Sequence, residues 1–165
     1  ERMKVSKRRR QENRTDYFKR RNLLKSEIPR IVFRKTNRYL ITQYIESKEA
    51  QDKIIFGLNS KQLLKYGWPK NLDSALKNTP AAYLFGIMAG KKITHNKLKT
   101  PILDFGLQRV LKGSKTQAFI KGLVDSGIKI KHKEENFPSK ERIHGKQIKE
   151  NFPFEEIKLK IEKEK

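Results

Sequence analysis

The segment Ala81–Lys92 constrains the fold more than any other part of the sequence, because it is apolar on nearly every side. Thr79 and Pro80 precede it and supply a cap and a first-turn proline, which predicts a helix. A helix that is apolar all round must be buried. We therefore expect this helix to be the most buried one. Small residues within it would allow close packing: Ala82, Gly86, Ala89 and Gly90.

Three short runs ahead of this helix are typical of strands. Arg30–Lys35 and Tyr39–Glu46 are rich in β-branched and aromatic residues, and Lys53–Leu58 contains a third such run. Asn37 lies between the first two and suits a positive φ in a tight hairpin. The three runs therefore predict an antiparallel meander.

The remaining elements of the body follow from caps and glycine stops. Ser60 is expected to cap a helix over Lys61–Tyr66 that ends at Gly67, and Ile102–Phe105 reads as a fourth strand. Ser114 is expected to cap Lys115–Ser126, which has one apolar face. The order β-β-β-α-α-β-α predicts an α/β fold with a mixed β-sheet and helices on both faces.

The two ends of the chain are expected to be extensions of this body. Residues 1–14 have almost nothing to bury and form a basic arm that should be disordered alone. Thr15 is expected to cap a helix over Asp16–Lys25 within a domain of residues 15–128. Residues 129–165 form a C-terminal extension with no evident core element. Short surface helices are expected there around Pro138–Ile148 and Phe154–Lys165.

Positive charge is concentrated near the N-terminus. Residues 1–38 hold 15 Lys and Arg against 4 Asp and Glu, which is half of the formal net charge of +22. A compact chain with that charge repels itself, so a polyanionic partner is expected. Nucleic acid, an anionic membrane and an acidic protein are the candidates. The membrane is disfavoured because no apolar run approaches the ~20 residues needed to span a bilayer, and no secretory signal is visible.

Enzyme chemistry finds little support in the sequence. The chain has no cysteine, and its three histidines are far apart, so neither a thiolate nor a zinc site is indicated. A metal-dependent nuclease would need several converging carboxylates, and the body offers mainly Asp104 and Asp125. There is no glycine-rich phosphate loop of standard spacing. We therefore expect no enzyme activity, no cofactor and no metal.

Nucleic-acid binding is favoured because the basic run continues from the arm into the predicted helix and hairpin, with aromatic residues interleaved. A second basic stretch, residues 109–115, lies before a predicted helix N-terminus, where backbone N–H groups could meet a phosphate. The candidate RNA-binding residues are Arg8, Arg9, Arg10, Arg14, Tyr17, Arg20, Arg21, Arg34, Lys35, Asn37, Arg38, Lys112, Ser114 and Lys115.

A succession of blocks from about Arg8 to Ile148 resembles the large-subunit ribosomal protein family numbered eighteen in the universal scheme, of archaeal and eukaryotic type. The blocks include Thr15-Asp16-Tyr17, Pro29-Arg30-Ile31-Val32, Arg34-Lys35-Thr36-Asn37, Tyr66-Gly67-Trp68, Asn78-Thr79-Pro80-Ala81-Ala82-Tyr83-Leu84, Leu103-Asp104-Phe105-Gly106-Leu107, Lys112-Gly113-Ser114-Lys115, Gly122-Leu123-Val124-Asp125-Ser126-Gly127 and Glu141-Arg142-Ile143-His144-Gly145. The segment from Glu46 to Asn59 matches loosely, and the tail from Lys149 matches no pattern.

The resemblance implies a ribonuclease H-like architecture without its catalytic carboxylates. It also implies a structural role in the large ribosomal subunit of the cytoplasm, where the protein would bind 5S rRNA in the central protuberance. Large-subunit rRNA and neighbouring proteins, including the 5S-associated protein of family five, are the implied partners. The alternatives are a non-ribosomal RNA- or DNA-binding regulator, for which no groove-reading element is evident, and the nuclease.

Overall fold

The computed structural model describes residues 5–49, 51–148 and 152–163. Its centre is a four-stranded sheet in the order β3-β2-β1-β4. The strands are β1 (Arg30–Lys35), β2 (Leu40–Lys48), β3 (Gln51–Asn59) and β4 (Ile102–Asp104). β1, β2 and β3 form the predicted antiparallel meander, while β4 pairs with β1 in parallel. The mixed sheet expected from the sequence is therefore confirmed.

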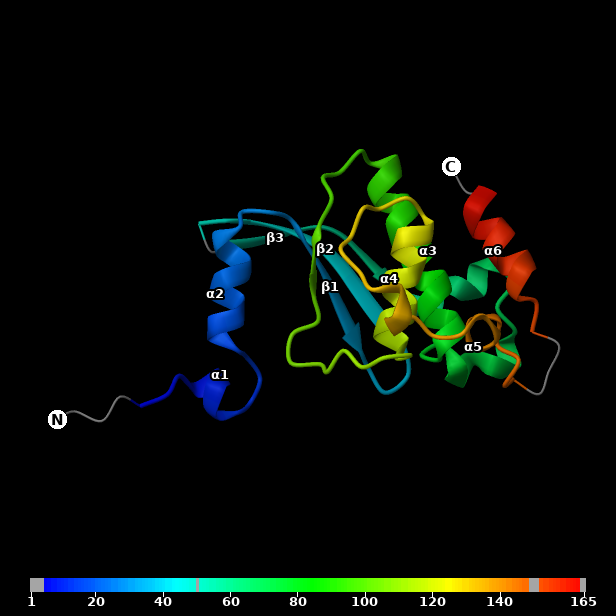
Figure 1. The fold of residues 1–165 in the computed structure, drawn as a ribbon, viewed down its shortest axis with the longest axis horizontal. Helices are drawn as coiled ribbons and strands as arrows, with labels where there is room; N and C mark the ends of the chain where they lie inside the picture. Colours follow the sequence, from blue (N-terminus) through cyan, green and yellow to red (C-terminus); the bar gives the residue numbers. More distant parts are fainter. Residues whose placement is uncertain (1–4, 50, 149–151, 164–165) are drawn as a thin grey trace.

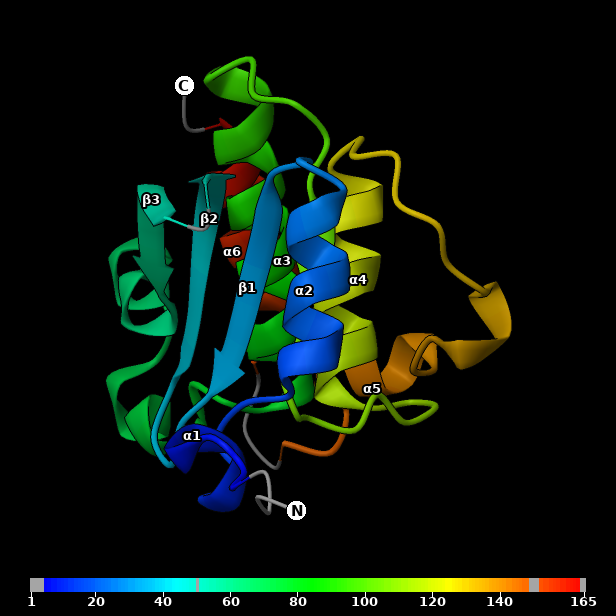
Figure 2. The same ribbon diagram turned by 90° about the vertical axis from the view of Figure 1, so that its left-hand side faces the viewer.

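Helices cover both faces of this sheet, as predicted (Figure 1, Figure 2). α3 (Thr79–His95) and α4 (Lys115–Asp125) pack on one face, and α2 (Tyr17–Lys25) lies over the other. α6 (Phe154–Lys163) packs on the side of α3 that faces away from the sheet. The shorter elements are α1 (Arg8–Gln11), η1 (Ser60–Tyr66), η2 (Lys70–Ala75), η3 (Glu134–Asn136) and α5 (Lys140–His144).

The most buried helix is α3, as its sequence predicts. The segment from Thr79 to Gly90 is buried without interruption, so the helix has no exposed face until its last turns. Its neighbours are the sheet on one side and α4 and α6 on others. The apolar surface of α3 is thus buried by the sheet and by the neighbouring helices.

α3 and α4 approach so closely that glycine is needed on both. A β-carbon at Gly122 of α4 would lie 2.2 Å from the carbonyl oxygen of Tyr83, and one at Gly86 of α3 would lie 2.3 Å from that of Phe119. Both oxygens belong to helix backbones, so neither can move without shifting its whole helix. The pair of glycines sets the distance between the two helices.

Replacing Gly122 with alanine is therefore expected to destabilise the protein by about 1–3 kcal/mol, the usual cost of overpacking a core. Urea unfolding followed by circular dichroism would measure the change. Gly57→Ala is the matched control, because a β-carbon there meets nothing closer than 3.8 Å. Equal unfolding midpoints for the two variants would contradict the close helix contact.

Several local predictions differ from the structure. At the β1–β2 turn, Asn37 does not have the predicted positive φ. The connection is four residues long, and the Thr36 hydroxyl closes it by accepting from Tyr39 N at 3.0 Å, so no tight two-residue turn is needed.

At three helix starts the capping residue is a neighbour of the predicted one. In place of the predicted Thr15, Ser60 and Thr79, the capping side chains are Asp16, Asn59 and Asn78.

The C-terminal extension contributes to the core, so the expectation that it has no core element is wrong. Phe154, Ile157 and Ile161 of α6 are buried, and they join the same apolar cluster as α3. The Phe154 ring lies 5.7 Å from the ring of Tyr83. The last residues of the predicted segment, 164 and 165, lie outside the described residues, as do residues 1–4 of the arm.

Candidate nucleic-acid interface

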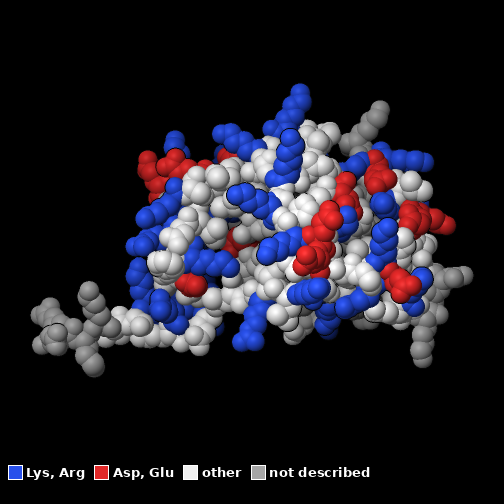
Figure 3. Space-filling model, in the orientation of Figure 1, with Lys and Arg blue, Asp and Glu red and all other residues white. Residues whose placement is uncertain are grey.

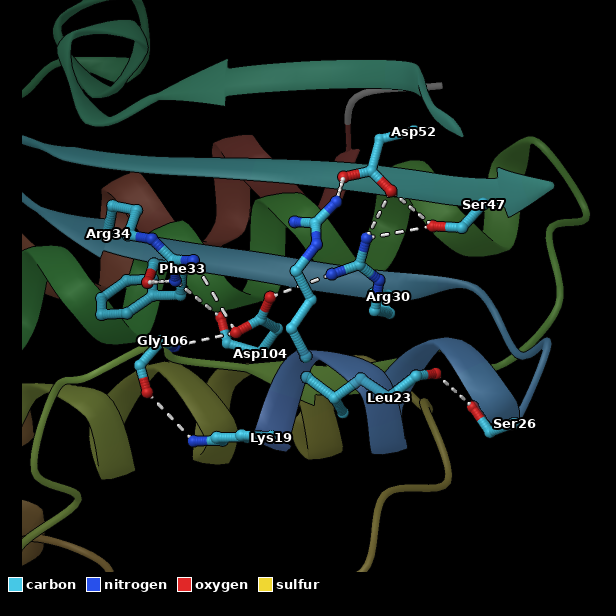
Figure 4. A network of polar contacts seen from close by, with 11 residues as sticks. Lys19, Leu23, Ser26, Arg30, Phe33, Arg34, Ser47, Asp52, Asp104 and Gly106 are labelled. Carbon is cyan, nitrogen blue, oxygen red and sulfur yellow. Dashed lines mark hydrogen bonds and ion pairs between the residues drawn. The ribbon is translucent and has the colours of Figure 1, made fainter. Parts of the chain in front are cut away.

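α2 rests on the sheet through polar contacts instead of a buried apolar face. None of its side chains is fully buried. Lys19 Nζ donates to the Gly106 carbonyl at 3.0 Å (Figure 4). An Arg20 guanidinium nitrogen lies 3.0 Å from a carboxylate oxygen of Asp52 in β3. The other cationic residues of α2, Arg21 and Lys25, are exposed.

A buried ion network lies beneath α2 (Figure 4). Arg30 of β1 is almost completely buried and donates to Asp104 at 3.2 Å and to Asp52 at 2.7 Å. Burial alone would raise the pKa of Asp52, but the hydrogen bond from Ser47 and the charges of Arg30 and Arg20 outweigh burial and lower that pKa. The network joins all four strands and fixes the platform on which α2 rests.

Arg34 extends this network to the protein surface. Its guanidinium donates to the Asp104 carbonyl oxygen at 2.9 Å and to the Phe33 carbonyl at 3.0 Å, yet its side chain is 41% exposed. Gly106 has a φ of +58°, and a β-carbon there would lie 3.2 Å from the guanidinium carbon of Arg34. The glycine therefore leaves room for a guanidinium that is fixed on one edge and open on the other.

The arm, α2 and the sheet converge on one small cavity of about 190 Å³. Two carboxylates, Asp16 and Asp104, also line it. Four predicted RNA-binding residues from three separate segments meet there, together with Lys19, which was not among the predicted site residues. The cationic residues around this cavity are Arg9, Arg14, Lys19, Arg20 and Arg34.

A second, shallower hollow of about 500 Å³ lies along α2. It brings together the predicted residues Tyr17, Arg20 and Arg21 with Lys7 and Lys25. The Lys7 ammonium lies 4.7 Å from the centre of the Tyr17 ring. An aromatic ring among cationic groups is the arrangement on which an unpaired base can stack while its phosphate is neutralised.

The described part of the arm forms one helical turn, α1, where disorder was expected. Arg9 Nε donates to the Thr15 hydroxyl at 3.0 Å, and the Glu12 carboxylate lies 3.5 Å from Arg8 and 3.3 Å from Arg14. These local contacts order the turn against the start of α2. Arg10, like Arg8, is exposed on this turn.

The second basic stretch meets the hairpin in space. Burial lowers the pKa of Lys115 at the start of α4, and the nearby ammonium groups of Lys77 and Lys35 lower it further. Lys77 also donates to the backbone carbonyl of Asn37 in the β1–β2 turn. Lys35, Lys77 and Lys115 thus lie near one another, although they are far apart in the sequence. We call these three residues the lysine cluster.

The lysine cluster should destabilise the free protein, because its charges repel one another. We expect Lys115→Met to raise the melting temperature at low salt, and the gain to shrink as salt screens the cluster. The pKa of Lys115 in the folded protein lies below its value of 10.5 in the unfolded chain, so between these two pH values the unfolded chain binds more protons. The parent protein should therefore gain stability as pH rises through this range. The variant should lack this gain.

Calorimetry at two salt concentrations and across alkaline pH would measure both effects. Lys131→Met provides the control, since Lys131 is exposed and lies in the segment after α4. Identical responses from the two variants would mean that the three lysines do not interact.

The remaining predicted residues have distinct positions. Arg38 in the turn and Lys112 before α4 are exposed. The Ser114 hydroxyl accepts from Gln117 N at 3.4 Å, which confirms it as the cap of α4. Asn37 meets Lys77 through its backbone carbonyl. Lys7 and Lys19 adjoin predicted arginines in the sequence but were not among the predicted site residues. Lys77 was missed because only the folded chain brings it to Lys35 and Lys115.

Lys and Arg side chains gather over α1 and α2 at one end of the molecule (Figure 3). In the described part of the chain, no three His, Cys, Asp or Glu side chains come together as a metal ion would require. No described helix has the length and apolarity to cross a membrane. The fold and these surfaces define the chain as a basic α/β protein suited to a polyanionic ligand.

Comparison with known proteins agrees with this class and makes it specific. Residues 1–101 match the family described as ribosomal large subunit proteins 60S L5 and 50S L18. The large ribosomal subunit protein uL18 of Korarchaeum cryptofilum is 46% identical over 147 residues, which cover 89% of this chain and 73% of that protein. The chain therefore belongs to the L18 family of large-subunit ribosomal proteins.

Two further archaeal relatives carry the same name. The uL18 protein of Caldivirga maquilingensis is 42% identical over 89% of this chain and 70% of its own length. That of Methanoregula boonei is 40% identical over 87% of this chain and 80% of its own length. The archaeal type of the resemblance is thus confirmed.

Membership makes the chain a structural protein of the large subunit of cytoplasmic ribosomes, with rRNA and other ribosomal proteins as partners, and not an enzyme. The regulator and nuclease alternatives are therefore set aside. Asp104, the leading nuclease candidate, is engaged by Arg30 and Arg34 and accepts from Gly106 N at 2.8 Å. Its role in this structure is to hold the β1–β4 junction.

Proposed function

We propose that this protein binds 5S rRNA through the arm, α2, the β1–β2 turn and the lysine cluster, and so anchors that RNA in the central protuberance. The 5S-associated protein of family five and large-subunit rRNA would be its neighbours there. The support comes from family membership together with the convergence of cationic groups on one part of the fold.

The observation that carries the proposal is the cavity shared by Arg9, Arg14, Arg20 and Arg34. Arginine offers planar, multiple donors that match phosphate oxygens, and phosphate contacts position a protein on a nucleic acid. Here the arginines come from the arm, α2 and β1. An RNA strand lying along this side would therefore contact three segments at once.

Competition binding tests the proposal. Labelled 5S rRNA from an archaeal relative would be bound by the full-length protein and then challenged with unlabelled 5S rRNA or with an unrelated structured RNA of equal length. We expect 5S rRNA to compete at far lower concentration than the unrelated RNA, because shape and unpaired bases add to phosphate contacts. Equal competition by the two RNAs would overturn the assignment to 5S rRNA.

A further inference from the structure

A third hollow lies far from the arm, where η1, the last turns of α3 and α6 meet. Its volume is about 420 Å³, within the range of pockets that hold small ligands. In Figure 1 its helices α3 and α6 lie toward the opposite end of the molecule from α1 and α2. The hollow is therefore separate from the proposed 5S surface.

The floor of this hollow is apolar. Leu58 of β3, Met88 of α3 and Ile161 of α6 line it and are buried in the core. Tyr66, at the end of η1, adds an aromatic ring to the lining. Lys91 Nζ donates to the backbone carbonyl of Glu162, which ties the wall formed by α6 to α3. The hollow could therefore bind a flat, largely apolar group without rearrangement.

The rim of the hollow is cationic. Lys65, Lys91 and Lys92 line it, and polar side chains come from His95, Gln62 and Asn96. Among the described residues that form the lining there is no Asp or Glu. An apolar floor with a positive rim matches a ligand that joins a flat ring to an anion.

We propose that this hollow binds one unpaired nucleotide of an RNA strand other than the one held by the arm. The base would lie against Met88 and Tyr66, while the phosphates on either side would face the rim lysines. Any base can stack, and lysine neutralises phosphate without distinguishing sequence. The site should therefore prefer single-stranded to double-stranded RNA and show little preference for sequence. The protein would then hold RNA at two opposite ends.

An acidic peptide is the competing occupant, and the shape of the hollow disfavours it. Carboxylates would satisfy the rim but would leave the apolar floor uncovered. A nucleotide uses both parts of the lining. The partners of a large-subunit ribosomal protein also include rRNA, which supplies unpaired nucleotides in its loops and bulges.

The two methionines of the chain allow a direct test. Full-length protein labelled with ¹³C at the methionine methyl groups gives two NMR signals, one from Met88 in the floor and one from Met3 in the arm. The probes are adenosine monophosphate, inorganic phosphate, a poly-glutamate peptide and a single-stranded RNA hexanucleotide. We expect saturable Met88 shifts, tightest with the hexanucleotide, weaker with adenosine monophosphate and weakest with phosphate.

Two pairs of lysine variants distinguish binding in the hollow from general attraction between RNA and a positively charged protein. Lys65→Gln with Lys92→Gln should weaken the Met88 response to the hexanucleotide at least several-fold. Lys97→Gln with Lys99→Gln removes the same charge from exposed lysines outside the lining and should leave the response unchanged. The Met88 response should persist when Arg8, Arg9 and Arg10 are replaced by alanine, even though that change weakens 5S rRNA binding.

Four results would overturn the proposal. They are a Met88 signal that no probe moves, a response to phosphate as tight as that to the nucleotide, a stronger response to the peptide, and equal weakening by both lysine pairs. A tighter response to adenosine monophosphate than to the hexanucleotide would instead make this a site for free nucleotides and would reject RNA as its ligand.

Discussion

Replacing Asp104 with alanine is expected to lower the free energy of unfolding by about 3 kcal/mol, because the buried charge of Arg30 would keep only one of its two carboxylate partners, Asp52. Arg30 would lose the partner at 3.2 Å, and Gly106 N would lose its acceptor. Arg30 Nε already finds no partner among the described residues, so losing Asp104 would add a second unsatisfied donor to the same buried guanidinium. Chemical denaturation at neutral pH would measure the loss.

Two variants make this result interpretable. Asp104→Asn keeps an acceptor for Gly106 N but removes the charge, so its stability should fall between those of the parent and Asp104→Ala. Glu141→Ala removes an exposed carboxylate that is paired with Lys146, and it should leave the unfolding midpoint nearly unchanged. If Asp104→Ala were as stable as the parent, the buried network would not hold the β1–β4 junction.

Replacing Arg8, Arg9 and Arg10 with alanine is expected to weaken 5S rRNA binding by roughly two orders of magnitude at 0.1 M salt. Each lost phosphate contact removes about 0.7–0.9 from the slope of log affinity against log salt, so the slope should flatten by about two units. Filter binding or fluorescence anisotropy over a salt series would measure both quantities.

The matched control for the arm is a triple change of equal charge elsewhere. Lys129, Lys131 and Lys133 are exposed in the segment that follows α4, away from α1 and α2. Changing these three to alanine should alter the slope far less than the arm variant does. A slope that is unchanged in the arm variant would mean that the arm does not contact the RNA.

Most elements of the fold could be predicted from the sequence because local patterns determine them. The all-apolar segment before Lys92 is buried as expected, and the β-branched runs form the expected meander. The errors at helix starts have a common cause. Where two neighbouring residues can both cap, as with Asn78 and Thr79, the backbone geometry of the folded chain decides between them.

The sequence-based prediction placed α6 on the surface because its many charged residues obscured the spacing of its apolar residues. Phe154, Ile157 and Ile161 are spaced three and four residues apart and share one helix face, which is the signature of a packed amphipathic helix. That spacing was available in the sequence. The partner face on α3 was not, because an apolar helix does not indicate which element covers each side.

The interface was only partly predictable for a related reason. Charge density and aromatic residues identified the arm, Tyr17 and Arg34 without any knowledge of contacts. The position of Lys77 beside Lys35 and Lys115 depends on tertiary folding, and nothing near it in the sequence marks it. Arg30 looks like an ordinary charged strand end in the sequence, yet it is buried because two carboxylates from other strands meet it.

We propose that the arm, α2 and the lysine cluster form one RNA-binding side of the protein. Lysine acetylation read by mass spectrometry, with and without bound 5S rRNA, tests it residue by residue. We expect strong protection of Lys19, Lys35, Lys77, Lys112 and Lys115, and unchanged reactivity of Lys129, Lys131, Lys140 and Lys158. Protection of the second group with the first left reactive, or equal protection of both, would contradict it.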